Sequence, residues 1–395
     1  MIDSEDIDWR WIEENAESDP DRLRLSAYGD PKRLFEITQT DCRRRCRKKL
    51  SDTLKRYPGF LFPSTLSAQQ STSDIFADFH ASLIEDGIKV LDMTGGLGID
   101  GLHLSRKASD VTICELNPET AECAERNFRY IGANNVSVLN CDSVDFIRKQ
   151  ADSAYDCIFI DPARRGDHGK RLFALGQCQP DVTSIIDEML RVAPRIIIKA
   201  SPMLDIKHTI SELHNVERII VLGNRTECKE LIIECRRIAS YAPMLESVTI
   251  DKGNIWKIPV VCDSADYSGK PAVKPCHYIY DPFPSYAKIC SISGSEVLHG
   301  VYKIAPSTNL YISRDIKAEF PGTPHEILTV DEMNKRSLKE IAISYPKIDV
   351  TAKNFPMTSA ELVKKLKTGS SSVFRLFAFN DEYGKKLLAV CRRVE

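Results

Sequence analysis

The chain has 395 residues, 43% of them hydrophobic and 28% charged, and this length predicts two or three domains. The composition is typical of a globular protein and excludes a disordered chain. With 54 Lys and Arg against 56 Asp and Glu, the net charge of -2 supplies no general attraction to nucleic acid. Any nucleic-acid binding therefore needs local basic patches.

The thirteen cysteines form no CxxC pair, and several, such as Cys114, Cys157 and Cys235, lie inside apolar runs. We therefore expect reduced core thiols and no metal site. The amino terminus lacks the pattern of a signal peptide, and no apolar run approaches the roughly 18 residues that cross a membrane. These features predict a cytoplasmic protein without a membrane partner.

Residues 1–62 are predicted to form a helical N-terminal segment. Its main feature is DCRRRCRKKLSDTLKRYPG, in which Asp41 is expected to cap a helix that ends before Tyr57. The basic residues of this helix are either a solvated face or a contact with an RNA backbone, and the sequence leaves both open: Arg43, Arg44, Arg45, Arg47, Lys48, Lys49, Lys55 and Arg56. A second helix is expected to start at Ser71, Thr72 or Ser73.

Residues 63–262 alternate between short apolar runs and helical stretches, which predicts an α/β domain with a parallel, Rossmann-like sheet. The last two strands are expected to form a hairpin around Asp251-Lys252-Gly253-Asn254. The predicted strands are IKVLDM, DVTICEL, NVSVLN, YDCIFID, RIIIKAS, VERIIVLG, ECKELIIECRRI and SVTIDKGNIWKIPVV.

A polar stretch rich in Gly, Pro and Ser then predicts a domain boundary. Beyond it we expect a C-terminal α+β region in two parts, 275–322 and 323–395. The first part is aromatic, and Tyr278, Tyr280, Phe283 and Tyr286 are predicted to form a small core. The second alternates strands and helices and carries a possible basic patch: Lys364, Lys365, Lys367, Arg375, Lys385, Lys386, Arg392 and Arg393.

The most informative segment is VLDMTGGLGIDG, a strand that leads through glycines into a helix. Gly96, Gly98 and Gly101 match the GxGxxG pattern, and Glu115 lies nineteen residues after Gly96. This pattern alone does not distinguish a nicotinamide dinucleotide from S-adenosylmethionine.

Three neighbouring acids favour the methyl donor. Asp92 ends the first strand, where its carboxylate would repel a pyrophosphate and attract the cationic amine and sulfonium of S-adenosylmethionine. Asp142 follows the third strand, as either an adenine contact or a helix cap. Asp161 and Pro162 end the fourth strand, facing the expected methyl acceptor.

The segments LDMTGGLGID, CELNPETAECAERNFRYIG, CD, FIDPARRG and IKASPMLDI resemble the class I S-adenosylmethionine-dependent methyltransferases that carry a C-terminal THUMP-like domain. The chain also resembles a Bacteroidetes-type member of this family, which has a small ferredoxin-like segment before that domain. The resemblance implies methylation of RNA, with S-adenosylmethionine as cofactor, and a ferredoxin-like segment over 275–322 followed by a THUMP-like domain over 323–395. It covers most of the chain from about residue 60.

The resemblance also implies roles for individual residues. It assigns a cofactor-binding set: Asp92, Thr94, Gly95, Gly96, Gly98, Glu115, Leu116 and Asp142. It assigns a catalytic motif, Asp161-Pro162-Ala163-Arg164, that lacks the second proline and the aromatic ring of amino-methyltransferases. Independently of the resemblance, residues that follow this motif or end the fifth strand are expected to contact RNA because they lie close to the methyl donor: Arg164, Arg165, Lys170, Arg171, Lys199 and Ser201.

The expected reaction is methylation of a base nitrogen in structured RNA, either tRNA or rRNA. Methylation at pyrimidine carbon 5 is disfavoured because it needs a cysteine nucleophile, and none follows Asp161. Among the histidines, His80 and His103 are expected to be structural, whereas His168 is a candidate proton acceptor. The alternatives are methylation of DNA or a small molecule, a non-catalytic RNA-binding protein with the same fold and, more distantly, a dehydrogenase.

Overall fold

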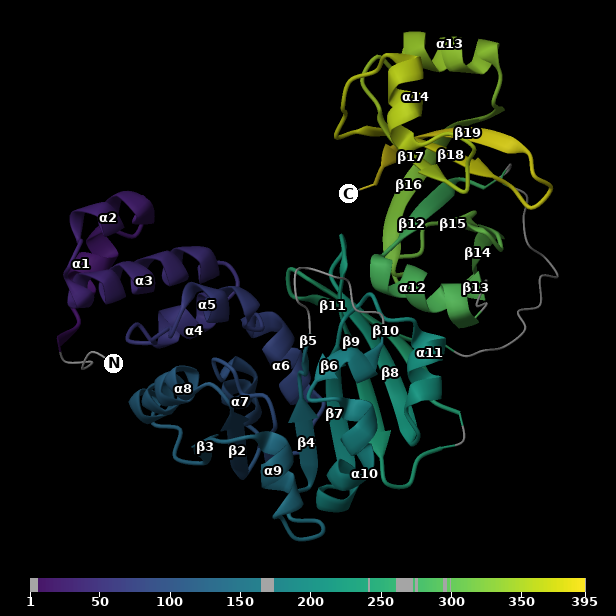
Figure 1. The fold of residues 1–395 in the computed structure, drawn as a ribbon. Helices are drawn as coiled ribbons and strands as arrows, with labels where there is room; N and C mark the ends of the chain where they lie inside the picture. The colour runs from purple at the N-terminus through teal and green to yellow at the C-terminus, as the bar shows by residue number, and fades with distance from the viewer. Residues whose placement is uncertain are drawn as a thin grey trace. The chain divides into compact units, whose positions relative to one another are not determined.

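The computed structural model describes residues 6–164, 174–240, 242–260, 273, 276–293, 297–298 and 300–394. The chain divides into two compact units (Figure 1). The first comprises Met1–Glu217 and Ile233–Ala242, and the second Arg218–Ile232 and Pro243–Glu395.

The first unit begins with short helices, most of them capped by an aspartate or serine side chain. Asp8, Asp19 and Asp30 each accept a backbone N–H at a helix start, which satisfies a donor that the helix itself leaves unpaired. Ser73 caps the sixth helix, one of the three starts predicted. The helices are α1 (Trp9–Glu14), α2 (Pro20–Ser26), α3 (Pro31–Cys46), α4 (Ser51–Arg56), α5 (Thr65–Gln70) and α6 (Asp74–Ser82).

The predicted helix start at Asp41 is wrong. Helix α3 begins at Pro31 with Asp30 as its cap, so Asp41 lies inside the helix, where it is 1% exposed. Its carboxylate accepts hydrogen bonds from Arg44 and Arg45, which compensates the charge that burial would otherwise penalise. The predicted single helix is also divided in two, since α3 ends at Cys46 and α4 begins at Ser51.

The centre of the first unit is a sheet in the order β9-β7-β4-β1-β2-β3, in which the strands from β7 to β3 are parallel and β9 contributes its second half. Strands β4 and β7 are buried along their whole length, as expected where helices cover both faces of a sheet. The predicted parallel strands are confirmed as β1 (Lys89–Asp92), β2 (Asp110–Glu115), β3 (Val136–Asn140), β4 (Cys157–Ile160) and β7 (Arg195–Ala200).

Helices follow the strands, as crossover connections between parallel strands require. They are α7 (Ile99–Leu104), α8 (Pro118–Ile131), α9 (Ser143–Arg148), α10 (Val182–Val192) and α11 (Ile206–Glu212). Between β4 and α10 lie a small ribbon of β5 (Ala163–Arg164) and β6 (Cys178–Gln179) and a short helix at Leu175–Gln177. This arrangement brings the carboxyl ends of β1, β2, β3 and β4 to one edge of the sheet.

The second unit begins with the strands β8 (Val216–Gly223), β9 (Cys228–Arg236), β10 (Met244–Asp251) and β11 (Asn254–Val260), in the order β11-β10-β8-β9. Strands β8 and β9 are joined by a tight connection, so they run antiparallel. The predicted hairpin is confirmed, and Lys252 and Gly253 turn it with positive φ angles of 48° and 83°.

The rest of the second unit is built on one sheet in the order β13-β14-β15-β12-β16-β19-β18-β17. Strand β16 pairs with both β12 and β19, so the segments 275–322 and 323–395 contribute to the same sheet. Its elements are β12 (Tyr278–Pro282), α12 (Pro284–Ser293), β13 (Val297–Leu298), β14 (Val301–Ala305), β15 (Thr308–Ser313), β16 (Gly322–Glu332), α13 (Lys335–Ser344), β17 (Asp349–Lys353), α14 (Ser359–Leu366), β18 (Phe374–Asn380) and β19 (Lys386–Arg393).

The two faces of this sheet are both covered. Phe377 and Phe379 of β18 pack into one cluster with strands β14 and β15, whereas Leu376 and Ala378 pack into another with helices α13 and α14. This alternation follows from the period of two along a strand. Three residues of the predicted aromatic core, Tyr280, Phe283 and Tyr286, are at most 2% exposed, whereas the fourth, Tyr278, is only half-buried. In the described part of the chain, no helix has the length and apolar character needed to cross a bilayer.

Candidate functional site

A cavity of about 1450 Å³ opens at the carboxyl edge of the parallel sheet in the first unit. Its wall comes from the loop after β1, from the ends of β2, β3 and β4, and from the connection between α5 and α6. The lining includes most residues predicted to bind the cofactor or to catalyse: Thr94, Gly95, Gly96, Gly98, Glu115, Leu116, Asp142, Asp161, Pro162 and Ala163.

The glycine loop after β1 lies directly against β2. The N–H of Gly95 donates to the carbonyl of Cys114 at 2.9 Å. A Cβ atom at Gly95 would lie 2.1 Å from Cγ2 of Ile113, so no larger residue fits without displacing that core side chain. Gly98, which precedes α7, has a φ of 83°, a conformation that favours glycine. The loop therefore presents backbone, without side chains, to the cavity at these positions.

Asp92 ends β1 beneath this loop and is 1% exposed. Its Oδ1 accepts a hydrogen bond from the N–H of Thr94 at 3.0 Å. The pKa of Asp92 is raised to about 8, mainly by burial and in addition by the nearby carboxylates of Asp100, Asp161 and Glu115. A cation bound beside Asp92 would relieve this repulsion, whereas a phosphate would add to it.

Glu115 and Asp142 stand at the ends of β2 and β3. The carboxylate of Glu115 accepts the N–H groups of Gly96 and Asn117, each at 2.7 Å, and so ties the glycine loop to β2. Asp142 caps α9, because its Oδ1 accepts the N–H groups of Val144 and Asp145. The capping role that the sequence left open is thus present, and both carboxylates still line the cavity.

The segment Asp161-Pro162-Ala163-Arg164 follows β4 at the same edge. The N–H of Asp161 donates to Oγ1 of Thr94 at 2.6 Å, which joins this segment to the glycine loop. Asp161 is 41% exposed in its side chain and lines the cavity. The backbone of Arg164 lies in β5, paired with Cys178 of β6. Four further candidates lie outside the described residues: Arg165, His168, Lys170 and Arg171.

Lys199, predicted to contact substrate, lies behind Asp161 and does not line the cavity. It is 8% exposed at the end of β7, and its Nζ donates to Oδ2 of Asp161 at 2.6 Å and to Oγ1 of Thr72 at 2.8 Å. Ser201, the other residue predicted there, accepts backbone N–H groups from Met203 and Leu204 in a turn. Neither position is among those that form the cavity wall.

Sequence reasoning missed the partners of Lys199. Thr72 donates to Oδ2 of Asp100 at 2.5 Å, and Oδ1 of Asp100 lies 2.8 Å from Nδ1 of the buried His80. A lysine at the end of the apolar run RIIIKAS was the available signal, because a buried lysine needs a paired carboxylate. His103 is likewise buried beside two aspartates, Asp74 and Asp78. The structural reading of His80 and His103 agrees with these contacts.

The basic N-terminal helix is largely bound within its own unit. The guanidinium of Arg43 donates to the carbonyls of Pro58 and Phe60, at 2.6 and 2.7 Å, and burial lowers its pKa to about 10. Arg44 and Arg45 bind Asp41, and Lys49 donates to the carbonyls of Ala68 and Gln69. Arg43 and Lys49 therefore tie α3 and the turn after it to later segments, whereas Arg44 and Arg45 pair within α3, and neither of the two sequence interpretations included these roles.

The described thiols at the site offer no exposed nucleophile beside Asp161. Cys157 is fully buried within β4, and burial raises its pKa to about 12. Cys178, opposite Arg164 in the small ribbon, is also buried. A thiolate is the nucleophilic form of cysteine, and burial in apolar surroundings disfavours it.

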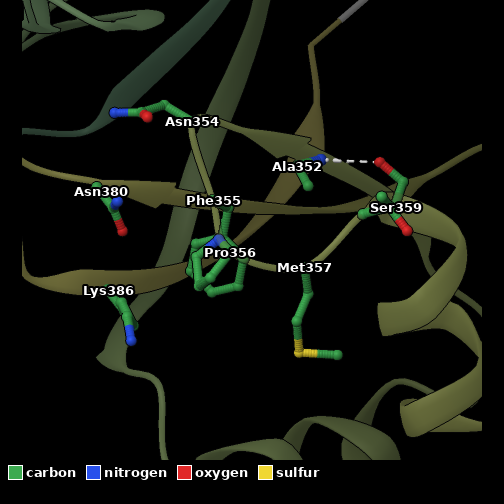
Figure 2. A pocket seen from close by; sticks show the side chains of 9 residues that line it. Ala352, Asn354, Phe355, Pro356, Met357, Ser359, Asn380 and Lys386 are labelled. Atoms are coloured by element: carbon green, nitrogen blue, oxygen red, sulfur yellow. Dashed lines mark hydrogen bonds between the residues drawn. The ribbon is translucent and has the colours of Figure 1, made fainter.

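A second hollow, of about 650 Å³, lies in the second unit between the loop after β17 and the strands β18 and β19 (Figure 2). Phe355, Pro356 and Met357 form part of its wall, Lys386 supplies a cation, and Ser359 accepts the N–H of Ala352 at 2.9 Å. Its described lining contains no carboxylate, so it lacks the charge pattern of the first cavity.

The comparisons with known proteins agree with this geometry. Residues 64–175 match the family model described as "Conserved hypothetical protein 95". The crystal structure described as a "putative methyltransferase from Porphyromonas gingivalis W83" is 27% identical and covers 100% of both chains with a TM-score of 0.84. The chain therefore has a Rossmann-like methyltransferase fold in a mixed α/β architecture.

Similarity to curated proteins is confined to part of the chain. A 23S rRNA (uracil(747)-C(5))-methyltransferase of Shewanella oneidensis is 31% identical over 28% of this chain and 25% of its own length. A protein of the same description from Pyrococcus abyssi is 26% identical over 38% of this chain and 34% of its own length. The matches thus span about a quarter to a third of these relatives, both of which are named methyltransferases.

Proposed function

We propose that the protein is an S-adenosylmethionine-dependent methyltransferase that acts on a base nitrogen in structured RNA, tRNA or rRNA. The observation that carries the proposal is the ring of carboxylates at four consecutive strand ends around the glycine loop, with Asp92 buried at its base. A cationic methyl donor suits this environment, and a dinucleotide pyrophosphate does not. The likeness to a methyltransferase structure over the whole chain supports the same reaction class.

The residues present fit the methyl donor. Thr94 and the loop Gly95–Gly98, which line the cavity, would hold its methionine end, and Asp92, which lies buried beneath them and is not part of the wall, would supply the negative charge. Glu115 and the neighbouring Leu116 would take the ribose. Asp142 would take the adenine amino group through the carboxylate oxygen that does not cap α9. S-adenosylmethionine supplies a methyl group on a positively charged sulfur.

The proposed transfer is an in-line displacement. The lone pair of the acceptor nitrogen forms the new N–C bond while the C–S bond breaks, and its electron pair remains on the sulfur, which becomes a neutral thioether. The nitrogen then releases a proton to water. Asp161 orients the acceptor by accepting a hydrogen bond from its N–H, so the contribution of the chain is positioning and charge stabilisation.

A nitrogen acceptor is favoured over carbon 5 of a pyrimidine. Carbon-5 methylation needs a nucleophile that adds to the ring. The cysteines that line the cavity are Cys114 in β2 and Cys141 directly after β3, and none follows Asp161 in the sequence. The relatives named as uracil carbon-5 methyltransferases match only part of this chain. Their reaction at carbon 5 of uracil is therefore not transferred to this protein.

RNA is the proposed acceptor because exposed basic residues are available in the second unit. The exposed cations lie in and next to α14 and on β19: Lys364, Lys365, Lys367, Lys386 and Arg393. Two other basic residues of this region, Arg375 and Arg392, pair with acids. Exposed cations of this kind bind phosphates in a salt-dependent way. We extend the proposal to a THUMP-like role for this region in holding structured RNA.

A second candidate is a non-catalytic RNA-binding protein that keeps the cofactor cavity. The observation that favours it is Ala163, which stands where amino-methyltransferases carry a second proline, in a segment without an aromatic ring. A methyltransferase acting on DNA or a small molecule is the alternative within the same reaction class.

Calorimetric titration tests the cofactor. We expect S-adenosylhomocysteine to bind the wild type and NADH not to bind. Asp92→Ala should weaken binding of S-adenosylhomocysteine by about 1–3 kcal/mol, the range for loss of a charge-assisted hydrogen bond. Absence of S-adenosylhomocysteine binding would overturn the proposal.

Methyl transfer tests the acceptor. Wild-type protein is incubated with methyl-labelled S-adenosylmethionine and total RNA from a host that lacks the gene, with RNase and DNase digestion as matched controls. We expect label that RNase removes and DNase does not. Cofactor binding without any transfer would favour the non-catalytic alternative.

A further inference from the structure

Lys199 and Asp161 form a close ion pair at the back of the cavity. The Nζ–Oδ2 distance is 2.6 Å, and the side chains are 10% and 41% exposed. The lysine is therefore withdrawn from water, while the carboxylate it contacts still reaches the cavity. Lys199 lies in β7 and Asp161 directly after β4, and these two strands are parallel neighbours.

The lysine is held by more than one element. Its Nζ also donates to Thr72, in the connection between α5 and α6, and lies 3.8 Å from Oδ2 of Asp100 in the first turn of α7. Although burial raises the pKa of Asp100, the charge of Lys199 and the contact with His80 hold it well below its usual range. The ammonium thus acts on both carboxylates and has little freedom to leave them.

We propose that Lys199 is a positioning residue, which keeps Asp161 as a carboxylate and directs it toward the acceptor nitrogen. This inference rests on the proposed function, and it assigns Lys199 a task distinct from the RNA contact expected from the sequence. An ionised Asp161 accepts the acceptor N–H more strongly than a protonated one, because one oxygen of a protonated carboxyl becomes a donor and the other is a weaker, neutral acceptor. Without Lys199, the neighbouring carboxylates would disfavour ionisation of Asp161 by electrostatic repulsion.

The titratable groups that face this pair in the described structure come from three other elements. They are Asp92 at the end of β1, Asp100 on α7 and, behind Asp100, His80 on α6. Without the ammonium, the carboxylates of Asp100 and Asp161 would repel one another across the site. Asp161 would then take up a proton at a higher pH than in the wild type.

The test compares Lys199→Met, which keeps the length of the side chain and removes its charge, with Lys199→Arg, which keeps the charge. Rates of methyl transfer to total RNA are measured at saturating S-adenosylmethionine from about pH 5 to 9. For Lys199→Met we expect a lower kcat and an acid limb displaced upward by about 1–3 pH units. Lys199→Arg should restore the position of that limb at least in part.

Lys107→Met is the matched control. Lys107 also donates to a backbone carbonyl, that of Ile84, and pairs with Asp86, but it lies outside the cavity lining. The Lys107→Met variant should have the same pH profile of methyl transfer as the wild type. An acid limb that stays in place in Lys199→Met, with the rate lowered equally at every pH, would mean a merely structural role and would overturn the proposal.

A double-mutant cycle in urea unfolding supplies a readout that does not depend on activity. We expect Lys199→Met to destabilise the wild type more than it destabilises Asp161→Asn. Equal effects in the two backgrounds would overturn the inference even if the wild type is active. An inactive wild type with a clear coupling would instead show that the ion pair forms but positions no acceptor, so the proposed function would fail with it.

Discussion

Charged side chains are buried at the carboxyl edge of the first sheet, whereas the ion pair compared with them on the C-terminal sheet of the second unit is exposed. At the first, Asp92, Asp100 and Lys199 are almost removed from water. At the second, the ion pair of Arg392 with Glu326 leaves both partners at least 38% exposed. Buried charges cost free energy unless they are paired, so a cluster of them marks a place where chemistry outweighs stability. The comparison favours the first edge as the proposed reaction site.

The largest effect that tests this comparison is expected at Asp161. Asp161→Asn keeps the size of the side chain and removes its charge, so methyl transfer to RNA should fall by about 10²–10³-fold, as for loss of one transition-state contact. The equivalent change on the C-terminal sheet, Asp331→Asn, alters an exposed residue of β16 and should leave the rate unchanged. Equal losses in both variants would remove the distinction between the two regions.

Glycine substitutions in the two regions should differ in their effect on stability, by less than the effect expected at Asp161. Gly95→Ala places a Cβ atom 2.1 Å from Ile113, so we expect a loss of about 1–3 kcal/mol of stability by overpacking and weaker binding of S-adenosylhomocysteine. At Gly369, in the second unit, an added Cβ would lie 3.6 Å from Lys347, an ordinary contact. Gly369→Ala should therefore stay within about 0.5 kcal/mol of the wild type by urea unfolding.

The smallest effect concerns pH. Because the pKa of Asp92 is raised to about 8, the cationic S-adenosylmethionine should lower that pKa on binding, release part of the Asp92 proton and bind roughly tenfold more tightly at about pH 8 than at about pH 6. S-adenosylhomocysteine, which lacks the charged sulfur, should show a weaker dependence. His325 in the second unit has a pKa lowered to about 4, mainly by burial, and stays neutral over this range.

The control for this prediction is Asp92→Asn. In this variant, calorimetry should find the same pH dependence of binding for S-adenosylmethionine and S-adenosylhomocysteine.

The raised pKa of Asp92 also has a consequence for stability. Asp92 ionises near its ordinary pKa when the chain is unfolded and near pH 8 when it is folded, so its protonated form favours the fold. Its contribution should therefore be present below about pH 4 and decline as the pH rises to about 8. A contribution that grows over this range would contradict the assignment.

Much of the first unit was predictable from the sequence because its signals are local. Continuous apolar runs such as RIIIKA report burial on both faces, and the glycine loop follows a strand at a recognisable spacing. The aromatic run 276–320 was harder, since its apolar residues serve one sheet that also includes 322–393, and pairing partners far apart in sequence leave no periodic signal.

The errors share a physical cause. Asp41 has the type and position of a helix cap, but its burial against Arg44 and Arg45 depends on how α3 packs. The charge run that includes Arg43 was expected to meet solvent or RNA, whereas Arg43 satisfies carbonyls fifteen and seventeen residues away. Charge in a sequence specifies neither its partner nor its exposure.

The sequence by itself determined the order of strands and helices, the glycine loop and the acids at the strand ends, because each follows from local pattern and chain order. Only the tertiary structure decided that Asp92 is buried and that Lys199 faces Asp161 instead of the cavity. The physical reason is that burial and ion pairing are properties of neighbours in space, and Lys199 meets Thr72 across 127 positions of sequence.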